Sequence, residues 1–251
     1  MKKNVLHMML SLTAMLLLLA CGNGTPKAVT ASLDSISVDT TASLSSDASV
    51  TVHVNLKYFK GANAAALNDS LMRMGILQPN YFATSYQPLD VQHTVKNFVR
   101  QFVADYQQIQ KTILQQEADA HPVLHYYYKV DAQVLAGKGD NLIYLAHVNS
   151  YLGGDAPEQY LLVRNIDKNG KWIHLDEAFD QEQLSSLTDG VTEQLMDQLD
   201  VADTVALRKQ GYFVGIKRYL PDNFMLFDDS VKFVYVPNEI NAKQVVVKIK
   251  L

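Results

Sequence analysis

Residues 142–179 read LIYLAHVNSYLGGDAPEQYLLVRNIDKNGKWIHLDEAF, and this stretch decides which fold the chain adopts. Every second side chain from Ile143 to Tyr151 points to one face of an extended strand, and the residues between them point to the other face. Gly153 and Gly154 end the strand, because glycine accepts the positive φ angles that tight connections require. The pattern predicts a strand that stops in a glycine-containing loop.

The same stretch continues with two further strands. A second strand is expected at residues 158–165, and Asp167-Lys168-Asn169-Gly170 after it has the composition of a hairpin turn. A third, short strand is expected at residues 171–175, and residues 176–179 lead into a helix. This stretch alone therefore predicts three antiparallel neighbours joined by short connections.

The rest of the chain supplies further strands and amphipathic helices. Residues 50–58 alternate between apolar and polar side chains, which is typical of a half-buried strand. Apolar residues within 89–120 recur every three or four positions, which indicates a long helix that Pro122 ends. Other strands are expected at residues 31–49, 123–135, 224–227, 231–236 and 245–249, and other helices at residues 65–75, 181–199 and 202–209.

This order of elements predicts an α+β fold in which helices pack on an antiparallel sheet, because tight hairpins rather than alternating βαβ units connect the strands. The length of the chain fits two small, intimately associated subdomains. We place the N-terminal subdomain at residues 31–137 and the C-terminal one at residues 138–251.

The first 20 residues have the features of an export signal. Lys2 and Lys3 provide a positive start, and the apolar run from Met8 to Ala20 is too short to span a bilayer comfortably. The run ends at Cys21 in a pattern that resembles a bacterial lipoprotein cleavage site. Cys21 is the single cysteine of the chain, so lipidation would account for an otherwise unpaired exported thiol. The alternative is a plain secretory signal in which Cys21 has no role.

We therefore expect residues 1–20 to be a lipoprotein signal peptide and residues 21–30 to be a tether. The expected location is the bacterial cell envelope, with the protein facing the periplasm or the cell surface. No later segment is apolar for long enough to span a membrane, so the lipid on Cys21 would be the only membrane anchor. The formal net charge of −4 makes nucleic acid a poor partner and a basic protein a better one.

The negative charge is concentrated between Asp176 and Asp203, where nine residues are acidic and none is Lys, Arg or His. On the expected helix, Asp189, Glu193 and Asp197 fall on one stripe opposite the leucines, and Asp200 continues it. Two interpretations stay open. The stripe is either a solvated outer face or a field that steers a cationic partner toward the protein.

No pattern of residues indicates catalysis, a metal ion or a cofactor. The sequence has no Gly-x-Ser-x-Gly elbow and no Ser-x-x-Lys set with partners. His121 and His125 are four residues apart but have no third ligand nearby, and the loop that starts at Asp167 has Ala178 where a calcium loop needs a carboxylate. We expect a protein without enzymatic activity.

The central stretch resembles the extracellular domain shared by RsiV-type anti-sigma factors and PdaC-type cell-wall deacetylases. That family has a Tyr-x-Gly-Gly loop, an Asn-x-Asp-x-x-Gly-Lys turn and a Leu-x-acidic-x-Phe helix start. The matching residues here are Tyr151, Gly153, Gly154, Asn165, Asp167, Gly170, Lys171, Leu175, Asp176 and Phe179. The tail from Asn223 to Ile240 also resembles the closing strands of the family. One departure is that Asp155-Ala156-Pro157 replaces the Ala-His that usually follows the two glycines, so any role of that histidine does not transfer.

The resemblance implies a binding function, because RsiV-like proteins sense lysozyme through this domain and PdaC-like proteins carry it beside a separate catalytic domain. We expect a lipid-anchored envelope protein that binds a basic partner such as a lysozyme-like wall-degrading enzyme, for sensing, capture or inhibition. The alternative is a module that binds peptidoglycan or another envelope glycan. Outward tyrosines of the Tyr126–Tyr128 run suit either stacking on a sugar or a protein interface, and the sequence does not separate the two. The expected binding residues are Tyr151, Gly153, Gly154, Asp155, Asp189, Glu193 and Asp197.

Overall fold

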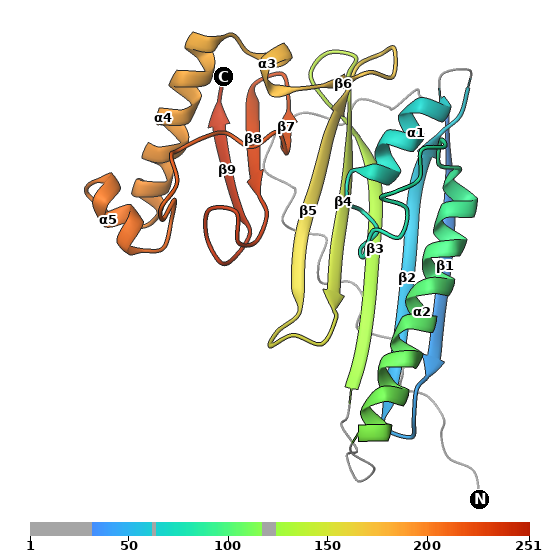
Figure 1. Ribbon diagram of the computed structural model, residues 1–251. Helices are drawn as coiled ribbons and strands as arrows, with labels where there is room; N and C mark the ends of the chain where they lie inside the picture. The colour runs from blue at the N-terminus through green and yellow to red at the C-terminus, as the bar shows by residue number, and fades with distance from the viewer. Residues whose placement is uncertain (1–31, 62–63, 117–123) are drawn as a thin grey trace, which may run out of the picture.

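The protein has an α+β fold built on two β-sheets, seen side by side in Figure 1. The computed structural model describes residues 32–61, 64–116 and 124–251. The larger sheet has six strands in the order β1-β2-β3-β4-β5-β6, and the smaller sheet has three in the order β7-β8-β9. Within the described ranges, no helix has the length and apolar character needed to cross a membrane.

The elements follow the sequence pattern closely. The larger sheet and its helices comprise β1 (Leu33–Ser43), β2 (Ala48–Phe59), α1 (Ala64–Arg73), α2 (Val91–Gln116), β3 (Leu124–Ala136), β4 (Leu142–Tyr151), β5 (Glu158–Ile166) and β6 (Trp172–Ile173). The smaller sheet and its helices comprise α3 (Leu175–Ala178), α4 (Gln181–Gln198), α5 (Thr204–Lys209), β7 (Phe224–Leu226), β8 (Ser230–Tyr235) and β9 (Val245–Lys250). The α+β class expected from the sequence is confirmed, and the last four residues expected in the long helix lie outside the described residues.

Helices α1 and α2 cover one face of the larger sheet, and the core lies between them and the strands (Figure 1). The apolar residues of β2 alternate, so Val50, Val52, Val54 and Leu56 are all buried on this face. An aromatic cluster fixes α2 to the sheet. Phe98 lies with its ring centroid 5.2 Å from that of Tyr128 on β3, and Phe102, Tyr106 and Tyr126 continue the cluster.

One pairing of strands differs from the sequence-based expectation. Strands β2 and β3 are parallel, although every other neighbouring pair in the two sheets is antiparallel. Parallel neighbours cannot be joined by a tight turn, and here α1 and α2 form the crossover between them. Alternating apolar residues specify a half-buried strand but not the direction of its neighbour, so the pattern of residues 50–58 could not predict this pair.

The two sheets are joined along the outer edge of β5. Strand β6 pairs only with Asn165 and Ile166, so the rest of that edge has no strand partner. Side-chain amides replace the missing strand: Asn223 accepts from the amide of Val163 at 2.6 Å and donates to the carbonyl of Leu161 at 2.9 Å. Because buried backbone groups of an unpaired edge are costly, these hydrogen bonds tie β7 to the larger sheet.

Asn165 completes this attachment from the opposite side. It is buried, and its side chain donates to the carbonyl of Phe224 at 2.8 Å and accepts from the amide of Leu226 at 3.0 Å. A small apolar cluster that includes Ile143 on β4 and Met225 on β7 packs between the two sheets at the same place. The boundary expected after residue 137 falls between β3 and β4, which pair along most of their length.

Replacing Asn165 by alanine tests the amide junction. Asn165→Ala leaves a buried amide and a buried carbonyl without partners, and we expect it to lower the free energy of unfolding by roughly 2–4 kcal/mol. Asn141→Ala is the matched control, because the Asn141 side chain makes no hydrogen bond in the described part of the chain; it should change stability by less than about 0.5 kcal/mol. Urea denaturation measures both, and equal effects of the two substitutions would contradict the role given to Asn165.

Candidate binding site

The loop after β4 is exposed at one end of the larger sheet. Residues 152–157 are all exposed, while Tyr151 before them is half-buried. Gly153 has a φ angle of +96°, and a Cβ atom at this position would lie 3.1 Å from Cε1 of Tyr126. The hydroxyl of Tyr106 on α2 donates to the carbonyl of Leu152 at 3.3 Å. The loop is thus accessible to a ligand and held in place by two buried tyrosines.

The Tyr126–Tyr128 run alternates between the two faces of the sheet. Tyr126 and Tyr128 are buried beneath α2, whereas Tyr127 is half-buried on the opposite face. There its ring lies 6.4 Å from that of Tyr151, and the ammonium of Lys129 lies 5.3 Å from its centroid. Burial raises the pKa of Tyr106, beside Tyr126, to about 12, so the buried side of this cluster stays neutral. Tyr127 and Tyr151 form the aromatic part of the outer face.

The outer face of β1–β3 is polar. His53 on β2 lies between two carboxylates, with its Nδ1 atom 3.2 Å from Asp39 and its Nε2 atom 3.4 Å from Asp131. The amide of Asn55 also donates to Asp131, at 3.1 Å. His125 at the end of the same face contacts the hydroxyl of Ser49 at 2.9 Å. The histidines of this face therefore have hydrogen-bond partners of their own.

The acidic stripe lies on the outer side of α4. Leu187, Val191 and Leu195 are buried toward the smaller sheet, and Asp189, Glu193 and Asp197 are exposed on the opposite side of the helix. Asp200, just after the end of α4, is exposed as well. Arg218 forms an ion pair with Asp189 at 3.2 Å, which sequence spacing could not indicate because the two residues are 29 positions apart. Among the described residues, Glu193 and Asp197 have no ion-pair partner within 4.0 Å.

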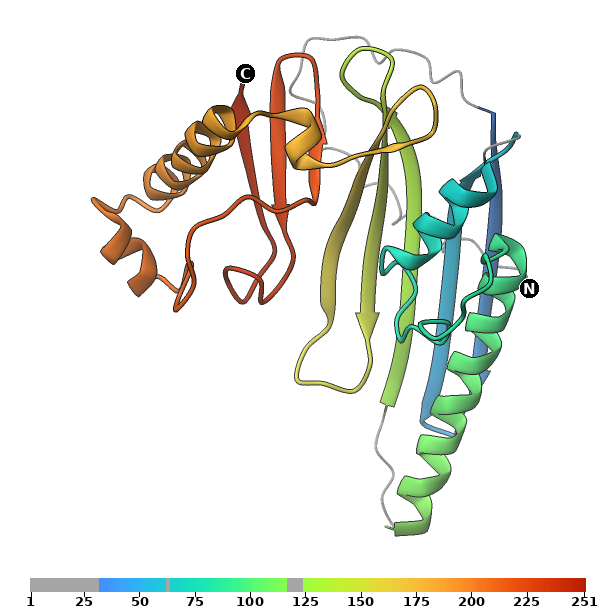
Figure 2. The same cartoon turned by 45° about the horizontal axis from the view of Figure 1, so that its top comes forward.

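The expected binding residues are divided between two places. The loop with Tyr151, Gly153, Gly154 and Asp155 connects the ends of β4 and β5 that point away from α3 (Figure 1). Helix α4, with Asp189, Glu193 and Asp197, lies on the far side of the smaller sheet in both Figure 1 and Figure 2. The structure therefore offers two separate candidate surfaces, an aromatic loop and an acidic helix face.

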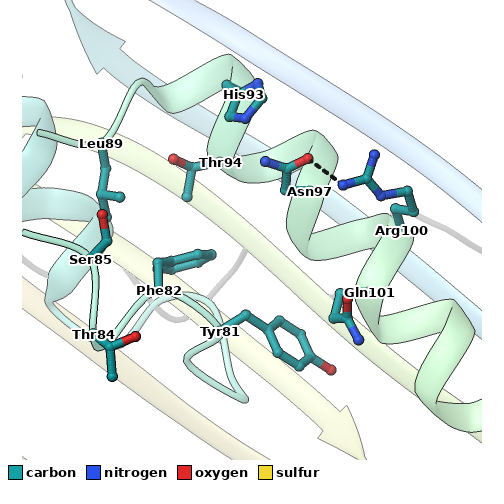
Figure 3. Close-up of a pocket in the computed structure, with 10 residues that line it drawn as sticks. All are labelled: Tyr81, Phe82, Thr84, Ser85, Leu89, His93, Thr94, Asn97, Arg100 and Gln101. Carbon is teal, nitrogen blue, oxygen red and sulfur yellow. Dashed lines mark hydrogen bonds between the residues drawn. The ribbon is translucent and has the colours of Figure 1, made fainter. Parts of the chain in front are cut away.

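A pocket of about 400 Å³ lies between α2 and the segment that precedes it (Figure 3). Tyr81 and Phe82 of the preceding segment face His93, Asn97 and Arg100 of the helix across it. The sequence analysis missed this site. The sequence did indicate the polar wall, because residues 93, 97 and 100 share one face of a helix and are all polar. The position of the aromatic wall opposite them depends on the fold and could not be predicted.

Several of the sequence-based expectations concern residues outside the described part of the chain. These are the signal peptide at residues 1–20, the tether at residues 21–30 with the lipidation site Cys21, and His121. In the ranges that the structure describes, no three His, Cys, Asp or Glu side chains are arranged to hold a metal ion.

Two solved structures have the same fold as this chain. A member of the DUF3298 family from Bacteroides fragilis NCTC 9343 superposes with a TM-score of 0.69 at 22% sequence identity, over 88% of this chain and 90% of that chain. A DUF3298 family protein from Pseudomonas aeruginosa PAO1 superposes with a TM-score of 0.56 at 13% identity, over the same shares of the two chains. No protein-family model and no curated protein matches the sequence. The structural neighbours are thus DUF3298 family proteins, and at these identities the likeness establishes the fold.

The two glycines of the loop provide a test of its geometry. Gly153→Ala places a side chain at a left-handed φ angle and against Tyr126, and we expect it to lower the free energy of unfolding by about 1–2 kcal/mol. Gly154→Ala is the control, since nothing lies within 4 Å of its added Cβ atom and its φ angle is not left-handed. Thermal or urea unfolding of both variants measures the difference. If Gly154→Ala were as destabilising as Gly153→Ala, the loop would have another conformation.

Proposed function

We propose that this protein is a lipid-anchored component of the bacterial cell envelope that works by binding another molecule and performs no catalysis. Its lipid anchor would be Cys21, and its partner a basic protein such as a lysozyme-like wall-degrading enzyme, which it would sense, capture or inhibit. The resemblance of residues 142–179 to the RsiV-type and PdaC-type extracellular domain supports this proposal. The DUF3298 fold of the neighbours is compatible with it.

The observation that carries the proposal is the acidic outer face of α4. Its carboxylates are exposed, and Glu193 and Asp197 have no cation of the described chain beside them. Like charges held on one helix face repel one another, so a positively charged partner gains free energy by approaching them. Such a field mainly accelerates association and makes it sensitive to salt.

Neutralising two acidic residues on this face tests whether it attracts a basic protein. We expect Glu193→Gln combined with Asp197→Asn to slow association with hen lysozyme by about tenfold at low ionic strength, and less at high salt. Asp47→Asn combined with Asp140→Asn removes the same charge from exposed positions elsewhere and should have a much smaller effect. Stopped-flow or surface plasmon resonance measurements give the rates. Identical rates for both double variants would contradict a role of the α4 face in association with lysozyme.

The second candidate function is binding of peptidoglycan or another envelope glycan. It is favoured by the pair of half-buried rings of Tyr127 and Tyr151, which lie next to the exposed loop at Gly153 and Gly154. Aromatic rings that expose one face are suited to stack on sugars, and the neighbouring polar side chains can hydrogen-bond to hydroxyl groups.

Tyr151→Ala distinguishes the two functions. If the glycan is bound at this loop, the substitution should weaken binding of soluble peptidoglycan fragments by roughly threefold to tenfold, because an aromatic contact of about 0.5–1.5 kcal/mol is lost. The same variant should leave the affinity for lysozyme unchanged, since the end of β4 that carries Tyr151 lies away from α4. Isothermal titration with both ligands makes the comparison. Unaltered fragment binding would exclude the loop as the glycan site.

A further inference from the structure

The pocket beside α2 differs in character from both surfaces discussed above. Its wall from the segment before α2 is aromatic, with the rings of Tyr81 and Phe82 turned toward the helix (Figure 3). Its wall from α2 is polar, with His93, Asn97 and Arg100 along one side of the helix. A volume of about 400 Å³ lies within the range of pockets that hold small organic ligands. The site therefore suits a small molecule with one apolar face and one polar edge.

Residues 85–89, which follow the aromatic wall, are held by hydrogen bonds that do not involve a ligand. Arg73 on α1 donates to the carbonyls of Ser85 and Gln87, each at 3.1 Å, and its guanidinium also contacts the carboxylate of Asp69. Asp69 in turn accepts from the amide of Leu89 at 2.7 Å. Because residues 85–89 are already held in place, a ligand is spared the entropic cost of ordering them.

Two other lining side chains, those of Tyr81 and Gln101, are also held in place. The hydroxyl of Tyr81 donates to Asp105 at 2.7 Å, and the side-chain amide of Gln101 donates to the same carboxylate at 2.8 Å. Burial and this carboxylate raise the pKa of Tyr81, so its hydroxyl remains a neutral donor held by Asp105. The carboxylate of Asp105 is thus engaged by two side chains of the pocket lining.

The outer rim carries the only permanent charge among the lining residues. Arg100 is exposed and donates to the side-chain oxygen of Asn97 at 2.9 Å. No carboxylate of the described chain lies within ion-pair distance of it. A guanidinium has five N–H donors in a fixed planar arrangement that matches a carboxylate, and Asn97 orients this one. The ring of His93 lies on the same side of the helix.

From these two walls we propose that the pocket binds a small acidic sugar, a pyranose that carries a carboxylate. The apolar face of the sugar ring packs on Phe82 and Tyr81, and its hydroxyl groups contact the polar side chains of α2. The carboxylate binds Arg100 at the outer rim. The site is separate from the α4 face and from the Gly153 loop, so it does not depend on the function proposed above.

Two sugars that differ by one carboxylate test the site. N-acetylmuramic acid is N-acetylglucosamine with an added lactyl carboxylate, and we expect the full-length protein to bind the acid about tenfold more tightly in saturation-transfer NMR titrations. Arg100→Gln should abolish this preference and leave weak binding of both sugars. Lys96→Gln, which removes an exposed positive charge from α2 outside the pocket lining, should preserve it.

Tyr151→Ala should also preserve the preference, which separates this pocket from the glycan site considered at the Gly153 loop. Equal affinity for the two sugars in the unsubstituted protein would overturn the proposal, as would a lack of binding by either. A preference for the acid that survives Arg100→Gln would overturn it as well.

Discussion

The structure depends on a few side-chain amides at the edge of β5. This strand has a full partner on one side only, and the smaller sheet approaches its other side without continuing the ladder. Asn223 and Asn165 supply the missing donors and acceptors, and Gln244 accepts from the amide of Leu161 at 2.6 Å. Because buried backbone groups must be paired, these contacts determine where the smaller sheet can sit. The smaller sheet is held against the edge of the larger sheet for this reason.

This attachment determines which surfaces remain free. The smaller sheet covers only the part of the larger sheet around Ile143 and Leu145, where the shared apolar cluster lies. The polar outer face of β1–β3 and the aromatic pair of Tyr127 and Tyr151 are left accessible. Helix α4 packs on the far side of the smaller sheet (Figure 2), and its carboxylates at Asp189, Glu193 and Asp197 are exposed. The candidate functions follow from these exposed surfaces rather than from an enclosed catalytic site.

Sequence patterns predicted the elements well because each depends on neighbouring residues. The alternation of residues 50–58, the DKNG turn after Asn165 and the leucines of α4 each act over a few positions, and the strands and helix they predicted are present. Other features depend on residues that are distant in the chain. The parallel pairing of β2 with β3, the ion pair of Arg218 with Asp189 and the pocket beside α2 all belong to this class. The burial of Asn165 is a further case, because a polar residue in a sequence gives no sign of its buried partners.

The central claim is that the outer face of α4 is the surface that meets a cationic partner. The most direct measurement is a set of NMR chemical-shift changes in the amides of the isotopically labelled protein as unlabelled lysozyme is added. The account predicts that the largest changes fall between residues 189 and 200 and shrink as salt is raised. Changes concentrated elsewhere, with the α4 amides unaffected, would contradict it.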